Sequence, residues 1–216
     1  EMFYSAAHDV LIQASAFDPA PEQWWSKPRE LGVRYVAYRG EDGQRLWDRI
    51  ITLNRPGGGH RMWYNWLLHD RTIILESYRD KDAEFYGFDL LTGVTKTRTS
   101  PLTGCEQPWG FARMGGCTKN VCCPNLVLFR SHTAGYYDMG GDGGTVNLSG
   151  FRPGCKNSLI PAGGLLNAPN YASGCTCNYP VFTSLALVPM PQLEQWSTNA
   201  YAYDGAPLRR LGINFG

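Results

Sequence analysis

The sequence lacks any long apolar run, and this excludes a helix that crosses a membrane. No stretch of about 18 consecutive apolar residues occurs in the 216-residue chain, so we expect no membrane span. The net charge is only +1, from 20 Lys and Arg against 19 Asp and Glu, and it offers no field that would attract nucleic acid or an anionic membrane. No signal peptide is recognisable at the start, so we interpret the chain as a mature or processed form.

Catalytic motifs with a fixed spacing are also missing. No serine stands in a Gly-x-Ser-x-Gly elbow. Two of the four histidines precede an aspartate, in His8-Asp9 and His69-Asp70. Because neighbouring residues on a strand point to opposite faces, neither pair suits a base with its orienting carboxylate, and we predict strand-end turns instead. We therefore predict no catalytic residue.

The composition that is present favours short strands and many turns. The chain has 25 Gly and 14 Pro, which punctuate turns, and 13% of its residues are aromatic. No segment has a convincing helical periodicity, and we expect at most one or two helical turns in residues 192–200. We predict an all-β fold whose sheets meet over wide, flat interfaces.

Three segments share one layout, in which a short strand leads through a glycine-containing turn into a second strand. They are Val36–Trp47 (VAYRGEDGQRLW), Tyr86–Arg98 (YGFDLLTGVTKTR) and Gly135–Leu148 (GYYDMGGDGGTVNL). An apolar strand that ends in serine precedes each of them, in VLIQAS, TIILES and LVLFRS. A period near fifty residues with several strands per unit is typical of propeller blades. The alternative is three unrelated hairpins in a β-sandwich.

The first unit resembles the tryptophan-docking repeat of PQQ-like β-propellers. Its frame is Ala37, Gly43 and Trp47. The resemblance implies that Trp47 lies flat against the neighbouring blade and that Ala37 leaves room for it. Burial of an indole stabilises by about 3 kcal/mol.

The other two units match the frame in part. The second keeps Asp89, Thr92 and Gly93 and has Gly87 fifty residues after Ala37, but Thr97 stands in place of the tryptophan. The first unit has Arg39 where the family has this aspartate. The third keeps Asp138, and its glycines are out of register. We predict blade packing through Ala37, Gly43, Trp47, Gly87, Asp89 and Gly93.

The cysteine-rich part resembles the terminal propeller segment of large secreted PQQ-like repeat proteins from planctomycete-type bacteria. Four motifs carry this resemblance: GGCTKN (115–120), SGFRPGC (149–155), IPAGGLL (160–166) and SGCTCNYP (173–180). It implies a fold and an extracellular, cell-surface or periplasmic location, without a reaction. We expect about three propeller blades in residues 1–150, and a Cys/Pro/Gly-rich segment in residues 151–216 that packs on the last blade and is held by bridges and not by a sheet.

Seven cysteines in a chain of this size favour disulfides in an exported protein. They are Cys105, Cys117, Cys122, Cys123, Cys155, Cys175 and Cys177. Their spacing lacks the paired Cys-x-x-Cys knuckles of a structural zinc site. An odd count leaves one thiol free or joined to another chain. A vicinal Cys122–Cys123 disulfide would resemble quinoprotein alcohol dehydrogenases, but the flanking sequence differs, and we expect the two cysteines to bond with different partners.

No cofactor is expected. The glycine-rich run around Asp138 and Asp142 could hold Ca²⁺, but it lacks the alternating carboxylates of an EF-hand loop, and a hairpin turn is the preferred interpretation.

Three functions are compared. The leading one is a non-catalytic, exported structural module that assembles with other copies or subunits into an extracellular complex or fibre, because three blades do not close a ring. The alternative is a secreted scaffold that binds carbohydrate or protein, which exposed indoles at Trp24, Trp25, Trp63 or Trp66 would favour. A PQQ-dependent or polysaccharide-active enzyme comes third, and needs a pair of carboxylates or a His cluster brought together in space.

Overall fold

The computed structural model describes residues 2–17, 30–54, 66–79, 82–100, 102–141, 143–155, 158–170 and 184–188. These residues form seventeen strands and no helix, so the prediction of an all-β fold is confirmed. Within them, no helix is long and apolar enough to cross a membrane.

Three antiparallel sheets of four strands follow one another along the chain. The first contains β1 (Met2–Ser5), β2 (Val10–Phe17), β3 (Glu30–Arg39) and β4 (Arg45–Asn54), side by side in that order. The second contains β5 (Trp66–His69), β6 (Thr72–Arg79), β7 (Asp82–Asp89) and β10 (Gly110–Arg113), and the third β11 (Val121–Cys122), β12 (Leu126–Ser131), β13 (Thr133–Asp138) and β14 (Thr145–Leu148). The three serine-ending strands of the sequence repeat thus form the second strand of each sheet.

The turns repeat as well as the strands. The residue after the third strand of each sheet donates its backbone N–H to a carbonyl in the turn between the first two strands. These bonds join Gly40 to Asp9 (2.7 Å), Leu90 to Arg71 (2.9 Å) and Met139 to Asn125 (2.8 Å). The repeat therefore extends to individual hydrogen bonds, which three unrelated hairpins would not share.

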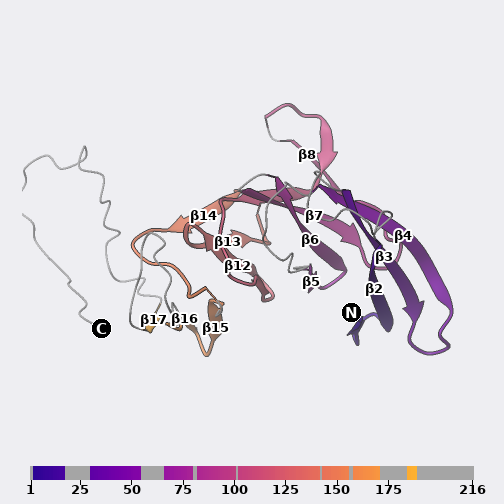
Figure 1. The fold of residues 1–216 in the computed structure, drawn as a ribbon, viewed down its shortest axis with the longest axis horizontal. Coiled ribbons are helices and arrows are strands. Elements are labelled where there is room, and N and C mark those ends of the chain that lie inside the picture. The colour runs from indigo at the N-terminus through magenta and orange to yellow at the C-terminus, as the bar shows by residue number, and fades with distance from the viewer. Residues whose placement is uncertain are drawn as a thin grey trace, which may run out of the picture.

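Apolar side chains fill the space between successive sheets. The first interface joins residues such as Ile12, Tyr35 and Trp47 to Ile73 and Leu75 of the second sheet. The second interface is built from stacked aromatic rings: Phe85 and Phe111 of the second sheet pack on Phe129 and Tyr137 of the third. In Figure 1 the sheets accordingly lie next to one another in chain order, along an arc.

A fourth sheet follows in the cysteine-rich part, where the sequence predicted segments held by bridges and not by a sheet. It consists of β15 (Ile160–Ala162), β16 (Leu165–Ala168) and β17 (Leu185–Leu187). The turn between β15 and β16 is Gly163-Gly164, and both glycines have positive φ (59° and 79°), which suits a two-residue hairpin. Leu166 and Ala168 then pack on the third sheet. This glycine pair is a hairpin signal that the prediction overlooked.

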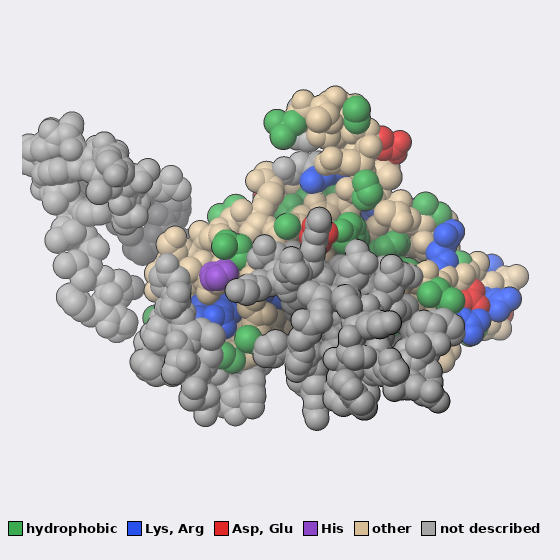
Figure 2. Space-filling view, turned by 45° about the horizontal axis from the view of Figure 1, so that its top comes forward, with side chains coloured by type: hydrophobic (Ala, Val, Ile, Leu, Met, Phe, Trp, Pro, Cys, Tyr) green, Lys and Arg blue, Asp and Glu red, His purple; other side chains and the backbone are tan. Residues whose placement is uncertain are grey.

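The two ends of the stack differ in polarity. On the first sheet, the face away from the second sheet carries exposed Gln13, Ser15 and Arg34, and Arg34 pairs with Asp48 at 2.5 Å. Figure 2 shows acidic and basic side chains gathered at this end. On the fourth sheet, the face away from the third sheet carries Ile160, which is 46% exposed, and no charged residue among those described.

A hairpin interrupts the last strand of the second sheet. It consists of β8 (Thr97–Thr99) and β9 (Glu106–Pro108), and it projects from the sheets in Figure 1. In the first sheet, Ala37 pairs with Trp47 across a bulge that leaves out Leu46. In the second sheet, Gly87 donates its N–H to the carbonyl of Trp109, and Lys96 takes the bulged place. Trp109, and not Thr97, therefore occupies the tryptophan position, displaced by twelve inserted residues.

We predict that deletion of residues 97–108, which joins Lys96 directly to Trp109, leaves the fold intact. Lys96 N–H donates to the Gly87 carbonyl and Trp109 N–H to the Lys96 carbonyl, at 2.8 and 2.7 Å, so the ends of the deletion already lie together. The free energy of unfolding, measured in urea, is expected to change by less than about 1 kcal/mol, since the loop contributes little core. An unfolded or insoluble variant would contradict the assignment of the hairpin as an insertion.

Candidate functional site

The indole of Trp47 joins the first sheet to the second. It is 9% exposed, and its Nε1–H donates to the carbonyl of Leu90 at 2.8 Å. The ring lies over Gly93, where an added Cβ would stand 2.7 Å from a ring carbon. Gly93 also has φ of +63°, so this position requires glycine both for its backbone and for the space the ring occupies. Ala37, fully buried, lies opposite Trp47 on the neighbouring strand.

The turn that receives Trp47 is fixed by Asp89. Its Oδ1 accepts hydrogen bonds from the backbone N–H and the hydroxyl of Thr92, both at 2.9 Å, and Arg71 Nε donates to its Oδ2 at 2.6 Å. Burial opposes ionisation of the carboxyl group, but the hydrogen bonds from Arg71 and Thr92 outweigh it and lower the pKa of Asp89. The carboxylate therefore stays ionised and holds the turn in the shape that the indole needs.

The other sheets carry versions of the same turn. In the first sheet, Arg39 stands where Asp89 does, and it forms an ion pair with Asp42 at 2.9 Å. Gly43 has φ of +70°, and nothing lies within 4 Å of the position that its Cβ would take. In the third sheet, Asp138 Oδ1 accepts from the N–H of Gly140 at 2.8 Å. The receiving turn of the first sheet is thus formed but carries no ring.

A second docking tryptophan, Trp109, joins the second sheet to the third. Its ring meets Tyr137 of the third sheet edge-on, with ring centroids 5.9 Å apart. Within its own sheet it covers Gly87, where a Cβ would collide with the indole. Unlike Trp47, it does not cover a turn glycine of the next sheet, since nothing lies within 4 Å of the Cβ positions of Gly143 and Gly144. The sequence comparison missed this residue because of the inserted hairpin. The available signal was the spacing: without residues 97–108, Trp109 follows Gly93 at the distance at which Trp47 follows Gly43.

The third sheet lacks a docking tryptophan. Val146 pairs with Tyr136 at the corresponding position, and it is 39% exposed. The contact with the fourth sheet is made by Leu128, Ala134 and Phe151 instead.

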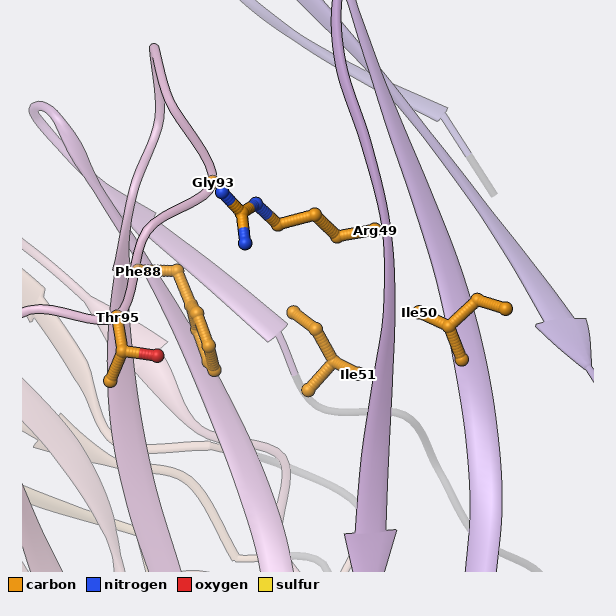
Figure 3. A pocket seen from close by; sticks show the side chains of 6 residues that line it. All are labelled: Arg49, Ile50, Ile51, Phe88, Gly93 and Thr95. Atoms are coloured by element: carbon orange, nitrogen blue, oxygen red, sulfur yellow. The ribbon is translucent and has the colours of Figure 1, made fainter.

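Beside the Trp47 contact, the first two sheets diverge and leave a groove of about 490 Å³. Figure 3 shows Ile51 of β4 facing Phe88 of β7, and Arg49 extending toward Gly93. Arg49 Nε donates weakly to the carbonyl of Thr92, at 3.4 Å. The groove therefore lies beside the Trp47 contact, and Arg49 crosses it at one end.

The two His-Asp pairs lie at turns, as the sequence predicted, and neither histidine bonds its own neighbour. Nε2 of His8 lies 2.8 Å from Oδ1 of Asp70 in the second sheet, and Nε2 of His69 lies 2.8 Å from the carbonyl of Pro124 in the third. The hydrogen bond from His8 lowers the pKa of Asp70, although partial desolvation opposes this. Each histidine thus links the turn of one sheet to the turn of the next.

A buried polar cluster lies between the second and third sheets. Glu76 of β6 and Arg113 of β10 form an ion pair in which both side chains have no exposed surface, and Arg113 Nε donates to Glu76 at 2.8 Å. Asn120 Nδ2 donates to the other carboxylate oxygen at 2.9 Å, and Arg113 Nη1 donates to the carbonyl of Arg130 at 2.8 Å. The bonds to Asn120 and Arg130 connect this pair to the residues of the third sheet, so separating the two sheets would leave buried polar groups without these partners.

Two of the cysteine-rich motifs meet beside this cluster. Thr118 of the GGCTKN motif is buried, and its hydroxyl donates at 2.8 Å to the carbonyl of Gly154 in the SGFRPGC motif. A Cβ on Gly116 would stand 2.8 Å from Cγ of Arg130. The sequence motifs therefore supply close backbone packing around Arg130.

No disulfide joins any two of the five cysteines within the described residues. Cys105 and Cys117 are exposed, while Cys122, Cys123 and Cys155 are half-buried; Cys175 and Cys177 lie outside the described residues. The neighbours Cys122 and Cys123 are not bonded to each other. Burial, and then the adjacent Cys123, raise the pKa of Cys122 from 9.0 to about 11, so this thiol is protonated at neutral pH and reacts slowly.

Within the described residues, the other candidates for metal or sugar binding do not come together in one site. Among the described residues, no three His, Cys, Asp or Glu side chains are grouped to hold a metal ion. Asp138 caps its own turn, and Asp142 lies outside the described residues. Of the four tryptophans considered for sugar binding, Trp66 stacks on Phe3 with ring centroids 3.8 Å apart; Trp24, Trp25 and Trp63 lie outside the described residues.

We predict that Gly93→Ala destabilises the protein more than Gly43→Ala. Both substitutions force alanine into positive φ, which costs about 1 kcal/mol, but only the first drives a methyl group into the Trp47 ring. The difference in the free energy of unfolding between the two variants is expected to be about 1–3 kcal/mol. Equal losses in urea unfolding would show that the indole does not depend on this contact.

Known proteins offer no further guide to the site. A comparison of the sequence with family models and with curated proteins found no match to either.

Proposed function

We propose that the chain is a non-catalytic structural module, an incomplete β-propeller of the PQQ-like kind, that associates with a second copy of itself. The docked tryptophans, the repeated turns and the four-stranded sheets support the propeller interpretation. The density of cysteines supports an exported location, outside the reducing cytosol.

The observation that carries the association is the uncharged far face of the fourth sheet. Leu166 and Ala168 of β16 pack on the third sheet, so Asn167 between them faces away. Ile160 of β15 and Ala186 of β17 both pair with Asn167 and share its face. Ile160 and Ala186 are exposed, and Asn167 Nδ2 is already bonded to the carbonyl of Ile160. This face therefore presents an exposed isoleucine and no charged side chain among the described residues.

The polarity of the other end decides the geometry of association. Head-to-tail stacking would bury the Arg34–Asp48 pair of the first sheet against an apolar face, and burying charges without new partners is unfavourable. When the fourth sheets of two copies meet, each uncharged face is buried against another uncharged face. This isologous contact gives a closed dimer, whereas unlike ends that meet generate rings or fibres. Of the complex or fibre expected from the sequence, this argument favours a closed complex.

Light scattering coupled to size-exclusion chromatography tests this function. We predict a dimer for the native chain, and a shift toward monomer for Ile160→Asp, which places a charge in the contact. Val94→Asp is the matched control, because Val94 is also about half exposed (50%) but lies in a turn of the second sheet. Monomer for the native chain at all concentrations, or equal dissociation of both variants, contradicts the proposal. Repeating the measurement with reductant separates association through this face from disulfide linkage.

A further inference from the structure

Arg130 is a buried guanidinium without an anionic partner among the described residues. The residue is 5% exposed, at the end of β12. Its only side-chain hydrogen bond there runs from Nε to the carbonyl of His132, at 3.3 Å. Nη1 is buried and has no hydrogen-bond partner. A neutral carbonyl satisfies one N–H but does not balance the charge.

The nearest carboxylate in the bonding network is already committed. Glu76 Oε1 accepts from Nε and Nη2 of Arg113, and Oε2 accepts from Asn120. Among the described residues, this carboxylate is therefore already bonded to Arg113 and Asn120. Arg113 in turn donates to the backbone carbonyl of Arg130, which brings a second cation to the same region.

Loss of a proton does not relieve the cost of burying an arginine side chain. A buried lysine or histidine becomes neutral when its charge is unfavourable, but the guanidinium of arginine stays protonated in proteins. A buried charge is tolerated when it is paired and hydrogen-bonded. The unbalanced charge of Arg130 therefore favours an anion beside the accessible part of the guanidinium, because a water molecule would not balance the charge.

The surroundings hold the guanidinium in place. Gly116 leaves the space that the Arg130 stem fills, since a Cβ there would stand 2.8 Å from Cγ. The adjacent turn residue His132 is exposed, so the site borders solvent. A fixed guanidinium presents parallel N–H groups that match the oxygens of a carboxylate or phosphate.

We propose that Arg130 binds a small oxyanion, a carboxylate or phosphate group, beside the His132 turn. The binding is independent of the association of two copies, because it uses the junction of the second and third sheets and not the far face of the fourth.

Thermal unfolding in the presence of inorganic phosphate, acetate or chloride, at matched ionic strength, tests the proposal. We expect the melting temperature to rise saturably with phosphate, acetate or both above its value in chloride, because an anion that binds only the folded state stabilises it. A rise with acetate alone identifies a carboxylate site, and a rise with phosphate alone a phosphate site. Equal melting temperatures in all three salts would overturn the proposal.

Two variants assign the effect to the residue. Arg130→Met keeps the length of the stem, removes the charge, and is expected to abolish the anion-dependent rise. Arg34→Met, which removes an exposed arginine of the first sheet, is expected to retain it. An anion effect that persists in Arg130→Met contradicts the assignment.

A measurement on the native chain covers the case in which Arg130→Met does not fold. The ¹⁵Nε–H resonance of Arg130 is expected to move with added phosphate or acetate and to reach a plateau, while the resonance of Arg34 follows only the change in ionic strength. An Arg130 resonance that does not respond to either anion would overturn the proposal independently of any variant.

Discussion

The structure depends on the contact between an indole and a glycine turn. Trp47 covers Gly93 and donates to the carbonyl of Leu90, so a single side chain buries apolar surface and satisfies a backbone acceptor on the next sheet. A four-stranded antiparallel sheet of this size has two faces to cover, and stacking on a neighbour covers one of them. The docked Trp47 sets the distance between the first two sheets and their relative position. The turn that receives it is therefore held by the ionised Asp89, its partner Arg71 and the hydroxyl of Thr92.

The same logic explains how the character of the interfaces changes along the chain. The first interface relies on Trp47, the second on Trp109 together with stacked Phe and Tyr rings and the buried Glu76–Arg113 pair, and the third on Leu128, Ala134 and Phe151 without a tryptophan. The ion pair lies within the second sheet, and it adds specificity to the second interface through its bonds to Asn120 and to the carbonyl of Arg130, which a different alignment of the two sheets would break. Among the described residues, the outer face of the first sheet carries charges and that of the fourth sheet carries none, and the proposed association rests on this difference.

Most of the fold could be predicted from local patterns in the sequence. The apolar segments VLIQAS, TIILES and LVLFRS and the fifty-residue spacing of Ala37 and Gly87 predicted three equivalent units, because strand alternation and turn chemistry are short-range properties. Trp109 was not predicted because the insertion of residues 97–108 changes its spacing from Gly93 in the sequence without changing its place in the sheet. Arg113 lies 37 positions after its partner Glu76 in the sequence, and Arg130 lies 54 positions after Glu76. These contacts depend on the order of the strands, which no local pattern of a single sequence encodes. The fourth sheet was missed because the cysteines drew the interpretation toward disulfides.

The ring current of Trp47 provides the most direct test of the docking contact. A glycine Hα under an indole face resonates upfield of its usual range, and an indole N–H bonded to a buried carbonyl exchanges slowly with solvent. The account predicts both effects in the native chain, at Gly93 Hα and at Trp47 Nε1–H, with ordinary shifts for Gly43, which no ring covers. Gly93 at an ordinary chemical shift, together with rapid exchange of the Trp47 indole proton, would show that the sheets are not joined in this way.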